Sequence, residues 1–187
     1  KKILMVHVDG PKEIMDAIDL KKKYGIRVVL VGCMGAEQVL DAITENNIPL
    51  IYTHVFSLPD KPDDPIDLAY KIPALLHSRN VLFGLAIDAS WQVRNLPFVA
   101  GTAAGYGLPK EAALQSITLN MAKILGIDDR AGSIEVGKDA HLIIAEGDIL
   151  DMQHAVVTHL FIQGRAVDLT NHQTQLFEKF SNKYKQP

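Results

Sequence analysis

The sequence of 187 residues predicts an α/β unit built on a parallel β-sheet, followed by a smaller all-β part. Two observations predict the first part: four short apolar runs, and intervening segments with the periodicity of amphipathic helices. Continuously apolar strands that alternate with helices are typical of parallel sheets covered by helices. One observation predicts the second part: after Gly132 the apolar segments are short and separated by turn residues. Four such βα units fit an open doubly wound domain or half of a (β/α)8 barrel, and periodicity does not decide between them.

The first part is expected to alternate regularly between strand and helix. The four strands are expected at Ile3–Val6, Val28–Val31, Pro49–Tyr52 and Val81–Ile87, and the helices at Pro11–Tyr24, Ala36–Glu45, Asp67–His77 and Lys110–Leu125. Pro11 suits the first turn of a helix and Gly25 suits a helix end. Pro73 is expected to break the third helix, since proline lacks an amide hydrogen.

The second part is expected to contain strands at Ser133–Val136, His141–Ala145 and Val156–Gln163, and then a final helix over Asn171–Tyr184. Glycine-containing turns separate the strands. We therefore divide the chain into residues 1–130, 131–168 and 169–187.

Composition excludes several classes of protein. The formal net charge of −3 gives no basic excess for nucleic acid, and no apolar run has the length of a membrane span. The single Cys33 excludes an internal disulfide. The chain begins without Met, inside a strand-like run, so we expect the interior of a longer protein, whose cellular compartment is left undecided.

Candidate site residues follow the predicted strands, because parallel α/β proteins collect functional groups at the carboxyl ends of strands. This rule selects His7, Gly32 with Cys33, His54, and Asp88. Two histidines and a carboxylate suit a divalent metal such as zinc, and Asp88 could accept a proton from a metal-bound water.

Each candidate also has a structural interpretation. A histidine at a strand end is more often a hydrogen-bonded residue than a ligand, and Asp88 could be the N-cap of the turn that follows it. Cys33 is expected to be a small buried hydrophobe. The remaining histidines are expected to be structural: His77, His141, His154, His159 and His172.

Several stretches resemble, in order, the end of a metal-dependent amidohydrolase of the imidazolonepropionase-like branch. They are Asn95–Leu108, Thr118–Gly126, Gly132–Ala140, Gly147–Asp151 and Phe161–Arg165. The resemblance implies strands five to eight of a TIM-type (β/α)8 barrel, plus C-terminal strands of a small β-sandwich. It also implies a C-terminal fragment whose missing partner is the N-terminal half of the barrel, or else a second copy of the chain.

The resemblance assigns His7 to the histidine of strand five and Asp88 to the aspartate of strand eight. The histidine of strand six falls at about Gly32, which implies a degenerate metal site. The implied activity is hydrolysis of the C–N bond of a small amide or cyclic amide by metal-activated water. The metal, most simply zinc, is expected in the full-length protein and little or no catalysis in this chain. Two alternatives are a catalytically silent, amidohydrolase-like binding protein and an α/β module without activity.

Overall fold

The computed structural model describes residues 2–59 and 61–184, which contain two separate β-sheets. The first sheet is entirely parallel, with the order β1-β2-β3-β4, as the alternating pattern predicts. Its strands are β1 (Ile3–Val8), β2 (Arg27–Gly32), β3 (Leu50–Tyr52) and β4 (Phe83–Leu85). The second sheet is antiparallel and contains β5 (Leu142–Glu146), β6 (Val156–Ile162) and β7 (Arg165–Ala166).

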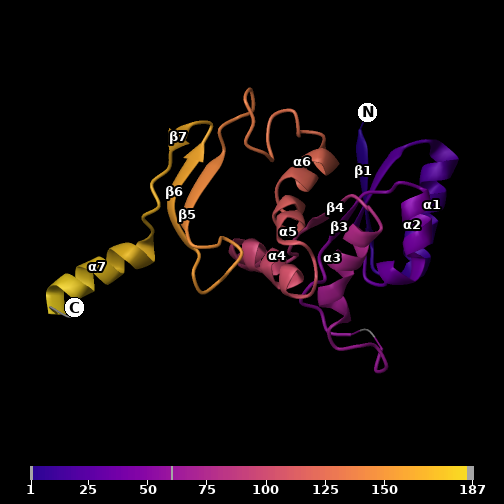
Figure 1. Ribbon diagram of the computed structural model, residues 1–187, viewed down its shortest axis with the longest axis horizontal. Coiled ribbons are helices and arrows are strands. Elements are labelled where there is room, and N and C mark those ends of the chain that lie inside the picture. Colours follow the sequence, from indigo (N-terminus) through magenta and orange to yellow (C-terminus); the bar gives the residue numbers. More distant parts are fainter. Residues whose placement is uncertain (1, 60, 185–187) are drawn as a thin grey trace.

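Helices connect the parallel strands and follow the last of them. They are α1 (Pro11–Tyr24), η1 (Ala36–Val39), α2 (Leu40–Glu45), α3 (Leu68–Ser78), η2 (Ser90–Asn95), α4 (Leu96–Gly105), α5 (Lys110–Ser116), α6 (Leu119–Leu125) and α7 (His172–Tyr184). Figure 1 shows α1 and α2 at one end of the molecule and α7 projecting from the other. No helix among the described residues is both long and apolar enough to cross a membrane.

The two faces of the parallel sheet are covered very differently. One face, which we call the helix-side face, packs against α1 to α5 and includes Val8, Leu30 and Tyr52 in the larger core. The other, the inner face, carries a small cluster of Val29, Val31 and Ile51 that α6 covers through Ile124 and Met121. Barrel strands have the same arrangement, with helices outside and apolar layers inside.

The α6 helix covers the part of the inner face where the strands begin. Arg27, the first residue of β2, donates hydrogen bonds at 3.1 Å to the carbonyls of Lys123 and Ile124. Asn120 donates to the carbonyl of Phe83, the first residue of β4. The carboxyl ends of the strands are therefore left for the functional groups.

Proline does not break the third helix, contrary to the expectation. The α3 helix runs through Pro73, which is buried. Proline removes the amide that would bond the carbonyl four residues earlier, that of Ala69. The Tyr52 hydroxyl donates to this carbonyl at 3.4 Å, which supplies a replacement partner.

The predicted helix Lys110–Leu125 is wrong as a single helix, because α5 ends at Ser116 and α6 begins at Leu119. The chain changes direction at Thr118, and α6 then crosses to the inner face. A helix period continues through this region, but the sequence pattern does not show that the two segments serve different faces.

The predicted strand Ser133–Val136 is also wrong. These residues form turns and bends, and Ile134 is 87% exposed. Ser133, Glu135 and Lys138 bond to one another within the loop. No neighbouring strand pairs with this segment within the described ranges, so its apolar residues remain in solvent.

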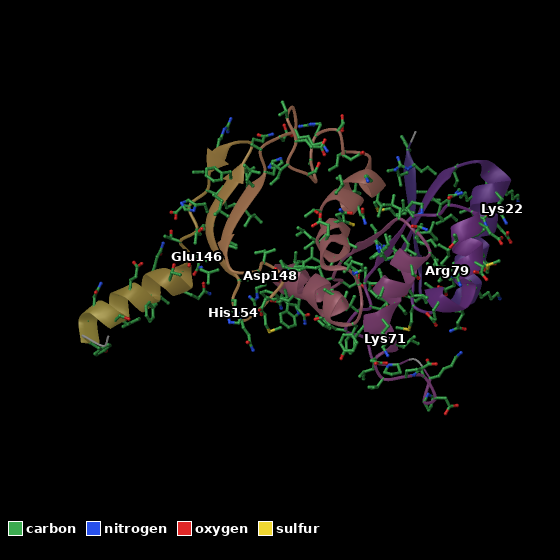
Figure 2. The ribbon with its side chains drawn as sticks, in the orientation of Figure 1. Lys22, Lys71, Arg79, Glu146, Asp148 and His154 are labelled. Carbon is green, nitrogen blue, oxygen red and sulfur yellow. The ribbon has the colours of Figure 1, made fainter. Side chains whose placement is uncertain are left out.

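The second sheet and α7 were expected at nearly the observed positions, but they bury little. Apolar residues of β5 and β6, among them Ile143 (58% exposed) and Val156 (56%), face solvent, and α7 has no buried residue among those described. The segment between β5 and β6 reaches back to α4, beside which Figure 2 places Asp148. Leu150 in that segment belongs to the larger core, so the connection is anchored by packing.

Candidate functional site

Strand register places His7 on the inner face of the sheet. His7 pairs with Val31, Val31 with Ile51, and Ile51 with Gly84, and neighbours in register point to the same side. His7 is nevertheless exposed, because β1 is an edge strand and nothing within the described residues covers its inner side at this end. The imidazole is thus available to a ligand or to another part of the protein.

Asp88 lies just beyond the end of β4 and is also exposed. Its Oδ2 atom accepts a hydrogen bond from Thr53 Oγ1 at 3.2 Å, which ties the chain after β4 to the chain after β3. The following turn is capped at Ala89 without a side-chain hydrogen bond, so the N-cap interpretation of Asp88 is wrong. The carboxylate keeps its second oxygen for other interactions.

His7 and Asp88 stand on opposite edges of the sheet. Three inter-strand spacings of about 4.8 Å separate β1 from β4, which amounts to roughly 14 Å between the backbones. No group of three or more His, Cys, Asp or Glu side chains is arranged to hold a metal ion in the described part of the chain. Taken alone, these residues do not fit a complete zinc site, which needs about four donors.

His54 faces the opposite side of the sheet from His7. Its ring contacts Tyr52 edge-on, and Tyr52 belongs to the helix-side core. Nε2 lies 3.0 Å from Asp9 Oδ1, and Nδ1 lies 3.0 Å from Ser57 Oγ. Both ring nitrogens are therefore engaged, so His54 could bind a metal only by giving up one of these partners.

Gly32 occupies the position where the resemblance expects a histidine, and the structure supplies a physical reason for glycine. Its φ is +96°, a conformation that residues with a side chain rarely adopt. A Cβ atom there would lie 2.9 Å from the carbonyl oxygen of Val8, and closer still to Asp9 Oδ1. A side chain at position 32 would therefore displace Asp9, the residue whose carboxylate pairs with His54.

Cys33 is fully buried, as expected for a small hydrophobe. Burial, and secondly the charge of Asp9, raises the pKa of the Cys33 thiol well above its usual range. A thiol held in its protonated form is a poor metal ligand and a poor nucleophile. Cys33 is therefore a core residue in this structure.

A second group of polar residues surrounds a cavity on the helix-side face of the sheet. Asp9, Glu37, Tyr52, His54 and Ser57 line it. Sequence reasoning selected only His54 from this set. Asp9, two residues after His7, is the one other member that the strand-end rule could have found.

These features define a class of protein: parallel βα units with polar groups at the carboxyl ends of the strands, followed by a small antiparallel sheet. The model of the amidohydrolase family matches residues 3–167. The chain belongs to the amidohydrolase family.

Two curated relatives carry the name imidazolonepropionase. The protein of Shewanella frigidimarina is 38% identical over 78 residues, which cover 41% of this chain and 18% of the relative. That of Syntrophobacter fumaroxidans is 44% identical over 54 residues, or 28% of this chain and 13% of the relative. The matched segments are thus small parts of both relatives.

Among solved structures, an amidohydrolase from Thermotoga maritima is similar with a TM-score of 0.79 and 31% identity. The match covers 88% of this chain and 43% of that chain. The chain therefore spans less than half the length of this relative, as expected for a fragment.

Proposed function

We propose that this chain is the C-terminal part of an enzyme that hydrolyses the C–N bond of a small amide or cyclic amide. Family membership supports the hydrolase class. Within the proposal, β1 to β4 are strands five to eight of a barrel in residues 1–130. Residues 131–168 contribute to a β-sandwich, and 169–187 are an appended helix.

The observation that carries the proposal is the open inner face, with His7 and Asp88 at the carboxyl ends of its two outer strands. Side chains from opposite edges can approach one another only over the centre of a barrel. We assign His7 as a metal ligand, and Asp88 as a ligand or as the base that takes a proton from the attacking water. His54 is a third candidate ligand, but its present hydrogen bonds would have to change.

A divalent metal, most simply zinc, would lower the pKa of a bound water in the whole protein. Since the described residues do not complete a site, its remaining ligands would come from outside this chain. This chain alone is therefore expected to show little or no hydrolysis.

The test compares the full-length protein with its Asp88→Asn variant on a panel of amides and cyclic amides, after the metal content has been measured. We expect bound divalent metal, and a decrease in kcat of about 10²- to 10⁴-fold in Asp88→Asn, the range typical of a lost acid–base group. The control is Asp63→Asn, which neutralises an exposed carboxylate outside the inner face. Equal losses in both variants, or a full-length protein without metal, would contradict the hydrolase proposal.

The second candidate is a catalytically silent binding protein. The glycine at position 32 favours it, since the geometry there excludes a histidine. Binding of an amide by the full-length protein without turnover would select this alternative.

A further inference from the structure

Thr53 follows β3 directly and lies on the inner face of the sheet. Ile51 packs in the inner cluster and Tyr52 in the larger core, so the alternation of side chains turns Thr53 to the inner face. The amide of Thr53 donates to the Gly32 carbonyl at 3.4 Å, so the pairing with β2 continues to this residue. Thr53 therefore shares the face on which we propose catalysis.

Asp88 is turned to the same face. Ala86 packs against the inner cluster and Ile87 against the larger core, so the next position points inward again. Thr53 Oγ1 donates to Asp88 Oδ2 at 3.2 Å, which is the contact expected between inner-facing side chains at neighbouring strand ends. The alternation along each segment and the distance between the two side chains therefore agree.

This hydrogen bond determines which oxygen of Asp88 is free. An aspartate carboxylate rotates readily, because the torsion about its Cβ–Cγ bond has broad minima. Threonine is branched at Cβ, which restricts its side chain and fixes the position of its hydroxyl. Within residues 2–59 and 61–184, no other group forms a hydrogen bond or an ion pair with the Asp88 carboxylate. Thr53 is thus the group that orients this carboxylate, and it leaves Oδ1 free.

The two residues beside Thr53 are themselves fixed. Tyr52 is buried and its hydroxyl donates to a carbonyl of α3, while the His54 ring is bonded through both of its nitrogens. Small displacements of a reacting group can cost much of a catalytic rate, so a donor that is anchored on both sides is effective. The Thr53 hydroxyl meets this requirement.

We propose that Thr53 is a positioning residue for the hydrolysis, which holds Asp88 Oδ2 so that Oδ1 is presented to the reacting water. The inference rests on the proposed function, in which Asp88 takes part in the reaction. Thr53 does not itself touch the reacting atoms and acts only through Asp88. Loss of its hydroxyl should therefore slow the reaction without weakening the binding of substrate.

The test compares the full-length protein with its Thr53→Val variant, which keeps the shape of threonine but lacks the hydroxyl, on the amide that the wild type hydrolyses fastest. We expect kcat to decrease about tenfold, the effect of a lost hydrogen bond to a charged group, and KM to stay within about twofold. Thr53→Ser keeps the donor and should restore most of the rate. The control is Thr158→Val in β6, whose hydroxyl donates to the Ile144 carbonyl of the second sheet, and its kcat should be unchanged.

Two further measurements separate positioning from a structural role. In the Asp88→Asn background, Thr53→Val should cause no further decrease in kcat, because the carboxylate that it orients is already absent. The second measurement is independent of turnover and follows the γ-carbon resonance of Asp88 in protein labelled with carbon-13 at its aspartate carboxylates. This resonance should shift in Thr53→Val and keep its wild-type position in Thr158→Val.

The results that overturn the inference differ from those that overturn the proposed function. An unchanged kcat in Thr53→Val, a Thr53→Ser rate as low as that of Thr53→Val, or an unshifted Asp88 resonance refutes the inference alone. Equal decreases with and without the Asp88 carboxylate do the same. A full-length protein that hydrolyses no amide refutes the proposed function and the inference with it. If Thr53→Val does not fold, Thr53→Ala, which removes the hydroxyl and adds no atoms, replaces it in every comparison.

Discussion

The contact between α4 and the segment that connects β5 to β6 gives a quantitative test of the fold. Gly101 lies in the middle of α4, and the backbone of Leu150 passes directly over it. A Cβ atom at position 101 would fall well inside the van der Waals radius of the Leu150 carbonyl oxygen. The Gly101→Ala substitution should therefore push the two segments apart.

The magnitude follows from two opposing effects. Alanine is favoured over glycine inside a helix by about 1 kcal/mol, whereas overpacking typically costs 1–3 kcal/mol. The obstructing atom belongs to the backbone of a residue in the core, so we take the upper end of the cost. The net loss in free energy of unfolding is then about 2 kcal/mol, which corresponds to a decrease in Tm of roughly 4–8 °C for a chain of this size.

Gly105 in the same helix is the matched control. It is exposed, and a Cβ atom there would meet nothing within 4 Å. Gly105→Ala should raise the free energy of unfolding by about 0.5–1 kcal/mol, because only the helix preference changes. Thermal unfolding followed by circular dichroism measures both variants. If Gly101→Ala stabilised the protein as much as Gly105→Ala, the close packing of Leu150 on α4 would be refuted.

Two further predictions concern the site and the sheet edges. Gly32→Ala should destabilise the protein by about 1–3 kcal/mol and change the His54 ring resonances, because it combines backbone strain with a contact to Asp9. The control is Gly137→Ala, which measures the strain alone because Gly137 has φ +95° and open space around it. Equal losses in the free energy of unfolding of both variants would contradict the contact. The chain of residues 1–187 should self-associate through β1 and β4, whose outer edges have no neighbouring strand among the described residues. Light scattering after gel filtration measures the mass of the particle, and a monomer that resists dilution would count against self-association.

The strands of the parallel sheet could be predicted from sequence because each is a short apolar run, and burial on both faces requires this composition. The α4 helix was missed because its residues, rich in glycine and alanine, show little amphipathic contrast. The break between α5 and α6 was missed for a different reason. Leu114 and Ile117 pack on the larger core while Met121 and Ile124 pack on the inner face, and one helical period describes both pairs.

The candidate site shows what a strand-end rule can and cannot decide. The rule predicts the edge of the sheet at which a residue lies. The face to which its side chain points depends on the alternation of side chains along the strand, that is, on whether the residue is an even or an odd number of positions from the buried ones. His7 is in phase with Met5 and Ile3, whose row meets Val29 and Val31, and so it reaches the inner face. His54 is in phase with Tyr52, a residue of the helix-side core, and so it turns away from Thr53 and Asp88. The register between strands was needed to learn which phase is the inner one, and this is a property of pairing rather than of any single segment. The same alternation separates the residues proposed for catalysis on one face from the cavity beside Asp9 and His54 on the other.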